Sequence, residues 1–280
     1  MKNILITGGT GTLGSKLVEY LQYGNNITVL SRDEKKLVEL RKKYSQVRII
    51  IGDIRRPLND REHVSYDTIF HCAALKHVDI GEEFPDEFYQ TNYQGTKNVW
   101  ELSERMKVKN FVFFSTDKAV LPVNAYGYSK GMAEKFLRYC GKPKIYRWGN
   151  IIGSRGSVIP TFVECILNDK PCVVTDARMT RFWLTIDEAI EFVLETYDKP
   201  ANDNPLIHPN IKSALVLDIV DVLGKILDRT PVIKFGEIRP GEKLHECLRT
   251  GHDYCIRSDN CDIYSREELK QKLLNYIKGH

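Results

Sequence analysis

Residues 3–14 read NILITGGTGTLG, in which an apolar run leads directly into a glycine-rich turn. The run Asn3–Thr7 predicts a buried strand, and apolar residues at helical spacing over Leu13–Leu21 predict a helix immediately after the turn. Glycines at such a turn let backbone amides approach a pyrophosphate, and the N-terminus of the helix favours its negative charge. The stretch therefore predicts a dinucleotide-binding βαβ unit; the alternative is a tight turn with a purely structural role.

Strands and helices alternate outward from this turn. Strands are predicted over Asn3–Thr7, Ile27–Leu30, Val47–Ile51, Thr68–Cys72, Asn110–Phe114 and Lys144–Trp148. Helices are predicted over Leu13–Leu21, Glu34–Tyr44, Asp86–Met106 and Tyr128–Tyr139. This alternation predicts an α/β fold with a doubly wound parallel sheet, the Rossmann arrangement.

The pattern changes after Gly149. Helical spacing recurs at 158–168, 186–197 and 213–228, with Pro- and Asn-rich pieces between, and Arg266–Ile277 predicts a terminal helix. We predict that residues 1–150 form an NADP-binding Rossmann domain, to which later elements can return. Residues 151–280 are predicted to form a smaller substrate-binding lobe over the carboxyl edge of the sheet, where open α/β folds bind ligands.

The composition is that of an ordinary globular protein of 280 residues. Lys and Arg number 41 against 37 Asp and Glu, a net charge of +4, and bases alternate with acids, so no nucleic-acid-binding face is predicted. No stretch approaches the roughly 18 apolar residues of a membrane span. The seven cysteines form no C-x-x-C pair. We therefore expect no metal site, reduced thiols and a cytoplasmic location.

The end of the second predicted strand bears on the choice of dinucleotide. NAD binders place an acidic side chain there, whereas this chain has Ser31-Arg32-Asp33 with Lys36 following. Arg32 can fork onto a 2′-phosphate, so NADP is predicted over NAD; the alternative is a solvated arginine. Asp53, after the third strand, is expected at the adenine amino group or, alternatively, as a loop cap. The predicted cofactor-binding residues are Gly8, Thr10, Gly11, Thr12, Leu13, Gly14, Ser31, Arg32, Asp33, Lys36, Asp53, Ile54, Ala73, Ala74, Asn92, Tyr126 and Lys130.

Tyr126 and Lys130 form the catalytic candidate. They share one helix face at i, i+4 and follow Ser115-Thr116-Asp117-Lys118 at the end of the fifth strand. A phenol has a reference pKa of about 10, which a nearby ammonium and an oxidised nicotinamide would lower. Tyr126 could then take a proton from a substrate hydroxyl.

This combination resembles the extended short-chain dehydrogenase/reductase superfamily, and within it the soluble inverting UDP-N-acetylglucosamine 4,6-dehydratases of polysaccharide biosynthesis. The likeness spans nearly the whole chain. It is carried by HCAALKHV at 71–78, TNYQGT at 91–96, STDKA at 115–119, GNIIGSRGSVIP at 149–160, MTRFW at 179–183 and RPGEKLHE at 239–246. Some relatives carry Met where Tyr126 stands, and the tyrosine points to the soluble inverting branch.

The resemblance implies a UDP-sugar site and residues for it. Arg181 and Arg239 would contact phosphates, which suits bidentate guanidinium groups. Glu242 would bind the uridine ribose, and Asn150 and Ser157 would lie near the diphosphate. The remaining substrate-binding residues implied by the family are Lys76, close to cofactor and substrate, and Val158.

The resemblance also implies a reaction, the dehydration of a UDP-sugar. Its product would be a UDP-4-keto-6-deoxyhexosamine for surface glycan biosynthesis. Tyr126 would deprotonate the 4-hydroxyl as NADP⁺ takes the C4 hydride, with Thr116 bonded to O4. Lys118 would remove H5, Asp117 would protonate the departing 6-hydroxyl, and the hydride would return to C6. The alternative for Asp117 and Lys118 is a structural salt bridge.

Two other functions stay open. A UDP-sugar 4-epimerase shares the Tyr–Lys pair but needs no acid–base pair for elimination, so Asp117 and Lys118 argue against it. A non-enzymatic NADP-binding regulator of the same fold usually lacks the catalytic Tyr or Lys, and both are present. The family further implies a homo-oligomer.

Overall fold

A seven-stranded parallel sheet organises the chain. The computed structural model describes residues 1–58, 65–141, 143–154, 156–200, 205–251 and 254–278. The strand order is β10-β6-β5-β4-β1-β2-β3, and every neighbouring pair is parallel. The predicted doubly wound Rossmann sheet is therefore confirmed. Its strands are β1 (Asn3–Thr7), β2 (Asn26–Ser31), β3 (Arg48–Ile51), β4 (Thr68–His71), β5 (Asn110–Thr116), β6 (Lys144–Trp148) and β10 (Leu206–Ile207).

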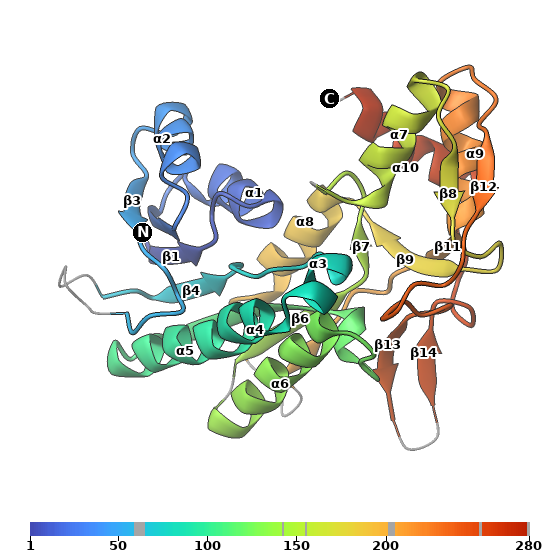
Figure 1. Cartoon of the computed structure of the whole chain (residues 1–280). Coiled ribbons are helices and arrows are strands. Elements are labelled where there is room, and N and C mark those ends of the chain that lie inside the picture. The colour runs from blue at the N-terminus through green and yellow to red at the C-terminus, as the bar shows by residue number, and fades with distance from the viewer. Residues whose placement is uncertain (59–64, 142, 155, 201–204, 252–253, 279–280) are drawn as a thin grey trace.

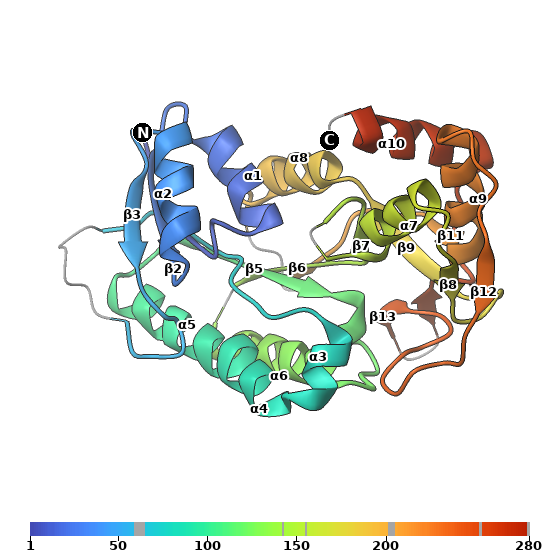
Figure 2. The same cartoon turned by 45° about the horizontal axis from the view of Figure 1, so that its top comes forward.

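Helices cover both faces of the sheet (Figures 1 and 2). One layer holds α1 (Thr12–Leu21), α2 (Glu34–Lys43) and α8 (Ile186–Thr196), and the other holds α5 (Gly95–Arg105) and α6 (Ala125–Cys140). Successive strand residues point to opposite faces, so Ile4 packs with Leu17 of α1 while Leu5 packs with Val99 of α5. Burial on both faces explains why these strands read as continuous apolar runs.

The predicted helix Asp86–Met106 is interrupted. It consists of α4 (Pro85–Phe88), a π-helical segment η1 (Tyr89–Gln94) and α5, and it is preceded by a short helix α3 (Val78–Glu83) that the sequence did not predict. The Thr96 hydroxyl donates to the Asn92 carbonyl at 2.6 Å, so this carbonyl of the π segment has a hydrogen-bond donor nearby in the sequence. A π segment inside a helix is frequently found at functional sites, and Asn92 lies in it.

The second half builds a smaller lobe around its own core. It contains β7 (Asn150–Ile151), α7 (Val158–Leu167), β8 (Cys172–Val174), β9 (Thr180–Leu184), β11 (Ser213–Leu215), α9 (Val216–Ile226), β12 (Ile233–Phe235), β13 (Cys247–Thr250), β14 (Cys255–Arg257) and α10 (Arg266–Lys278). Buried side chains such as Phe162, Trp183 and Leu223 form this core. Two elements, α8 and β10, instead return to the large sheet.

The prediction of one helix over 213–228 is wrong at its start. Ser213–Leu215 pairs with β9 as an antiparallel strand, and α9 begins only at Val216. The pairing partner lies about 30 residues earlier in the chain, beyond the reach of local periodicity. No helix in the described ranges is long and apolar enough to cross a membrane.

A buried arginine, paired with a glutamate of the first half, ties the two halves together through a hydrogen bond to the second half. Arg147 of β6 donates through Nε to Glu134 of α6 at 3.0 Å, and its Nη1 donates to the Leu248 carbonyl of β13 at 2.9 Å. A second guanidinium nitrogen contacts the same carboxylate. Both side chains are buried, so the pair is screened little by solvent.

Removing one member of this pair is expected to destabilise the protein strongly. Glu134→Leu would leave the Arg147 guanidinium buried without its counter-charge, at a cost of about 3–5 kcal/mol in the free energy of unfolding. Urea unfolding measures this cost. Lys135→Gln, at the exposed neighbouring position, is the control and should change the free energy by less than about 0.5 kcal/mol. Equal effects of the two substitutions would contradict the prediction.

Candidate active site

The glycine-rich turn has the shape of a pyrophosphate cradle. Gly8 has φ +66°, and a Cβ there would lie 2.7 Å from the backbone of Ala73. A Cβ at Gly14 would lie 2.5 Å from the Gly8 carbonyl oxygen. Gly11 precedes α1 and offers no capping side chain, and no acidic residue occupies the first turn that begins at Thr12. Amide groups at this helix end therefore suit an anion, and the residues fit a dinucleotide.

Side chains at the ends of β2 and β3 already have local partners. The hydroxyls of Ser31 and Thr10 are 3.0 Å apart. Asp33 caps α2 by accepting from the Lys36 amide at 3.0 Å, and the Lys36 ammonium lies 2.7 Å from the same carboxylate. Arg32 is exposed next to them. The exposed Arg32 side chain can therefore turn toward a phosphate.

Asp53 forms a local ion pair. Its carboxylate accepts from the Arg55 amide at 3.0 Å and from the Arg55 guanidinium at 2.6 Å. Hydrogen bonding to that guanidinium lowers the pKa of Asp53. This matches the loop-capping alternative, and contact with adenine stays a prediction. The neighbouring Ile54 is buried in the core below.

Asn92 organises the loop after β4 from beneath. Its side chain accepts from the Leu75 amide at 2.8 Å and donates to the Leu75 carbonyl at 2.9 Å. It also donates to the Ser129 hydroxyl of α6 at 3.0 Å. Because Asn92 is fully buried, it links Leu75, which directly follows the predicted cofactor-contacting residues Ala73 and Ala74, to α6 from within the protein.

A triad of side chains gathers where β5 ends, in which Thr116 and Asp117 are buried and Lys118 is partly buried. Thr116 donates to Asp117 Oδ1 at 3.0 Å, and Lys118 Nζ donates to the same oxygen at 3.1 Å. Lys118 also donates to Asn150 Oδ1 at 3.3 Å. The turn η2 (Asp117–Ala119) packs closely on α6, since a Cβ at Gly127 would lie 2.3 Å from the Lys118 carbonyl oxygen. The structure thus brings four predicted site residues together.

The charges of this triad are strongly perturbed. Burial raises the pKa of Asp117 although the Lys118 ammonium opposes the shift, and its Oδ2 has no hydrogen-bond partner among the described residues. Burial opposes the Lys118 ammonium, but Asp117 and Glu246 outweigh it and raise the pKa of Lys118. Asp117 thus tends to keep its proton, and it lies beside Lys118, which is flanked by two carboxylates. Acid–base catalysis uses such neighbouring groups with perturbed pKa values.

Tyr126 and Lys130 share a face of α6, but their electrostatics differ from the expectation. Burial raises the pKa of Tyr126, and the ammonium that opposes this is Lys118, not Lys130. Burial also lowers the pKa of Lys130 to about 7, so this side chain loses its charge near neutrality. Its Nζ lies 3.8 Å from the centre of the Phe113 ring. The unliganded chain therefore does not by itself provide a phenolate at Tyr126.

The predicted substrate residues are spread along the smaller lobe. Arg181 is buried, with Nη2 3.6 Å from Glu242 and Nη1 donating to the Thr180 carbonyl at 2.8 Å. Arg239 is exposed, and its amide donates to Glu242 at 3.4 Å. The segment 239–242 thereby lies next to Arg181.

The predicted substrate residues Ser157 and Val158 lie at the start of α7. Ser157 precedes Val158, the first residue of this helix, and its buried hydroxyl has no partner in the part of the chain that the structure describes. Lys76 donates to the Ser154 hydroxyl at 3.3 Å. Arg155, within the same motif, lies outside the described residues.

Sequence analysis missed Glu246 and Lys243. Glu246 Oε1 lies 3.4 Å from Lys118 Nζ, and its Oε2 lies 3.5 Å from Lys243 Nζ. Lys243 also donates to the Val120 carbonyl at 2.7 Å, just beyond η2. Both residues belong to the RPGEKLHE string, which was the available signal, but only Arg239 and Glu242 in it received roles.

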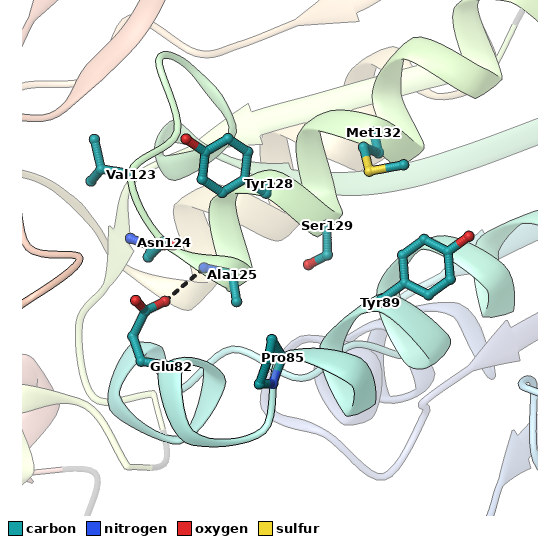
Figure 3. Close-up of a pocket in the computed structure, with 9 residues that line it drawn as sticks. All are labelled: Glu82, Pro85, Tyr89, Val123, Asn124, Ala125, Tyr128, Ser129 and Met132. Carbon is teal, nitrogen blue, oxygen red and sulfur yellow. Dashed lines mark hydrogen bonds between the residues drawn. The ribbon is translucent and has the colours of Figure 1, made fainter.

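A cavity of about 400 Å³ lies beside the start of α6 and is separate from this cluster. Figure 3 shows its lining residues: Glu82, Pro85, Tyr89, Val123, Asn124, Ala125, Tyr128, Ser129 and Met132. The dashed line is the bond from the Ala125 amide to Glu82, 2.8 Å long. At 100° per residue, Ala125, Tyr128 and Met132 occupy a different face of α6 from Tyr126 and Lys130.

Comparisons with known proteins agree with this geometry. The family model described as polysaccharide biosynthesis protein matches residues 4–268. A Campylobacter jejuni UDP-N-acetylglucosamine 4,6-dehydratase (inverting) is 36% identical over 271 residues, covering 90% of this chain and 78% of the relative. A Rickettsia typhi UDP-glucose 4-epimerase is 33% identical over 295 residues, covering 99% and 86%.

Solved structures show the same fold. The X-ray structure of Pen from Bacillus thuringiensis superposes with a TM-score of 0.88 at 32% identity, covering 98% of this chain and 97% of that one. The Streptomyces venezuelae dTDP-glucose 4,6-dehydratase, solved with NAD and TYD bound, has a TM-score of 0.82 at 21% identity, covering 99% and 97%. Together with the family model, these matches confirm the resemblance that the motifs predicted.

The buried Lys130 is expected to make stability pH-dependent. Its pKa is about 7 in the folded chain, against about 10.4 when unfolded, so between these values the unfolded chain binds more protons. The free energy of unfolding should then rise with pH above 7, with a contribution of up to about 1.4 kcal/mol per pH unit from this residue. Urea unfolding at pH 6.5 to 9.5 should show that Lys130→Met loses this slope, whereas exposed Lys135→Met keeps it. Parallel curves for wild type and Lys130→Met would refute the assignment.

Proposed function

We propose, from the premise that this chain belongs to the polysaccharide biosynthesis protein family of extended short-chain dehydrogenases/reductases, that it is a nucleotide-sugar 4,6-dehydratase. Its proposed substrate is UDP-N-acetylglucosamine, its cofactor NADP, and its product a UDP-4-keto-6-deoxyhexosamine with inverted C5. The observation that carries the proposal is the pair of buried Asp117 and partly buried Lys118, 3.1 Å apart, on the same catalytic edge as Tyr126. Oxidation at C4 alone needs no such pair; elimination of water across C5–C6 does.

The smaller lobe supports a nucleoside diphosphate. Arg181 is preorganised by backbone carbonyls and faces Glu242, which could accept from ribose hydroxyls. The Ser157 hydroxyl, which has no partner among the described residues, stands at the N-terminus of α7, an end that favours phosphate. Arg239, exposed beside Glu242, adds a second guanidinium for the diphosphate.

The glycine turn and Arg32 support NADP as the resident dinucleotide. Gly8 and Gly14 leave room at the backbone that any side chain would fill, and exposed Arg32 can pair with a 2′-phosphate. When bound, the dinucleotide would supply the hydride acceptor for C4 and return that hydride at C6.

This chain's own residues then move the protons. Tyr126 takes the proton of the 4-hydroxyl as a phenolate, a form that the positive charge of a bound oxidised nicotinamide would favour, while Thr116 bonds O4. The resulting ketone acidifies H5, which passes to the Lys118 amine as Asp117 gives its proton to the departing 6-hydroxyl. Lys118 later returns a proton to C5. The 4-keto product and water then leave. The overall reaction is a dehydration with no net oxidation or reduction.

Thr116 can also carry a proton from Tyr126 to Asp117 at the end of the turnover. Over one turnover Tyr126 gains a proton and Asp117 loses one, so one proton must travel from the phenol to the carboxylate. The Thr116 hydroxyl is hydrogen-bonded to both groups. It therefore connects the donor and the acceptor directly, and both Thr116 and Asp117 are buried.

A UDP-sugar 4-epimerase is the second candidate function. It is favoured by the Rickettsia typhi relative, named as a UDP-glucose 4-epimerase, which matches 99% of this chain. Tyr126 and Lys130 would suffice for that reaction. The buried acid Asp117 would then have no proton to deliver, which is why dehydration is the better account of the site.

Product analysis tests the two functions against each other. Purified protein and UDP-N-acetylglucosamine, without added reductant, should yield a 4-keto-6-deoxy sugar by NMR, with solvent deuterium at C5. Lys118→Ala should slow dehydration by at least about 100-fold through loss of the base, with dinucleotide binding unchanged. The surface variant Lys109→Ala is the control. A C4 epimer as sole product, or unchanged turnover in Lys118→Ala, would overturn the proposal.

Dinucleotide preference is tested at Arg32. Arg32→Ala should weaken NADP⁺ binding by about tenfold or more, the equivalent of one lost charged contact, and leave NAD⁺ binding unchanged. Calorimetric titration of both dinucleotides measures this, with the exposed Lys35→Ala as the matched control. Equal losses for both dinucleotides would remove Arg32 from phosphate recognition.

A further inference from the structure

Glu246 is a buried carboxylate without a role in the reaction just described. It immediately precedes β13 and is 3% exposed. Its amide donates to the Ser258 hydroxyl at 2.9 Å, and its carbonyl accepts from the Ser258 amide at 2.9 Å. Because β13 packs against η2, this fixed backbone delivers the side chain to the catalytic turn from the other lobe.

The carboxylate of Glu246 divides its two oxygens between two ammonium groups. Oε1 lies 3.4 Å from Lys118 Nζ and Oε2 lies 3.5 Å from Lys243 Nζ. Lys118 thus stands between two carboxylates, because Asp117 Oδ1 is 3.1 Å from the same nitrogen. The charged and titratable groups around the pair are Asp117 and Lys118 of η2, Tyr126 of α6, Arg181 of β9, and Glu242, Lys243 and Glu246 before β13.

Elimination needs one proton shared between Asp117 and Lys118. With two protons the amine has no lone pair for H5, and with none there is no acid for the leaving hydroxyl. The pair therefore works between its two macroscopic titration steps. A fixed negative charge beside both groups moves both steps to higher pH, since it stabilises each protonated form.

We propose that Glu246 is a positioning residue for the elimination: its carboxylate holds Lys118 beside Asp117 and sets the pH range in which they share one proton. This inference rests on the proposed dehydratase function. In the step it serves, the C5–H bond breaks and its proton goes to the Lys118 amine. The electron pair forms the C5=C6 bond, the C6–O bond breaks, and water leaves with the proton of Asp117. Glu246 itself neither gains nor loses a proton.

The surroundings of Glu246 keep it anionic for this task. Burial opposes the charge, but Lys118, Arg181 and Lys243 outweigh it and hold the pKa of Glu246 below its usual value. The anion in turn acts on its neighbours, contributing to the raised pKa of Asp117 and of Lys118. Arg181 also pairs with Glu242 at 3.6 Å, and the Glu246 carboxylate directly faces the ammonium groups of Lys118 and Lys243.

The test is the pH dependence of kcat for dehydration in Glu246→Gln. Both limbs of the bell should move to lower pH, by about one unit or more, because a buried charge is lost within 4 Å of the pair. Lys243→Met removes the cation on the other oxygen and should move both limbs to higher pH. Exposed Glu237→Gln is the control and should leave the profile in place.

A purely structural role would lower kcat equally at all pH values and leave both limbs unmoved, which overturns the inference. If Glu246→Gln fails to fold, judged by its thermal melt and NADP⁺ binding, the Lys243→Met profile decides, and an unmoved profile overturns it. The product of the wild-type enzyme distinguishes failure of the Glu246 inference from failure of the proposed dehydratase function. A 4-keto-6-deoxy product with unmoved limbs rejects only the role of Glu246, whereas a C4 epimer rejects the dehydratase function and this inference together.

Discussion

The ammonium of Lys118 is held between the carboxylate of its neighbour Asp117 and that of Glu246 from the second half of the chain, and the site depends on this interaction. Asp117 comes from the end of β5, and Glu246 comes from the segment before β13. A buried charge is tolerable only when its partners are fixed. The two halves of the chain must therefore be held in one arrangement, and Arg147 of β6, which contacts Glu134 of α6 and the Leu248 carbonyl of β13, provides a second buried link between these halves.

Burial of the charged groups around Lys118 costs stability but favours acid–base chemistry. Desolvation makes each charge expensive, yet it also raises the pKa of Asp117 and lets a single nearby charge shift a proton from one group to another. The close approach of Gly127 to the Lys118 carbonyl shows how little space remains around the turn. At a surface, an acid and a base side by side would form a solvated salt bridge, whereas here Asp117 is fully buried and the Lys118 side chain is only 16% exposed.

Local patterns predicted the first half of the chain well. The glycine turn, the alternating strands and helices and the i, i+4 spacing of Tyr126 and Lys130 depend on residues close in sequence, and the parallel sheet is confirmed. Family motifs extended the prediction to Arg181 and Glu242, which the structure places 3.6 Å apart. Where local spacing carried information, boundaries were correct to within a few residues.

The failures share a physical cause. Ser213–Leu215 reads as helix because its strand partner, β9, is distant in sequence, and the π segment at Asn92 depends on contacts with the Leu75 loop. Glu246 was overlooked for the same reason: an isolated glutamate in a motif is usually solvated, and only tertiary packing reveals an anion 3.4 Å from Lys118. Electrostatics of Tyr126 and Lys130 were likewise inverted by burial, which no spacing rule reports. Charge states in such a site are set by desolvation and by groups from remote segments, so a sequence motif can nominate the acid and the base while the fold determines which of them holds the proton.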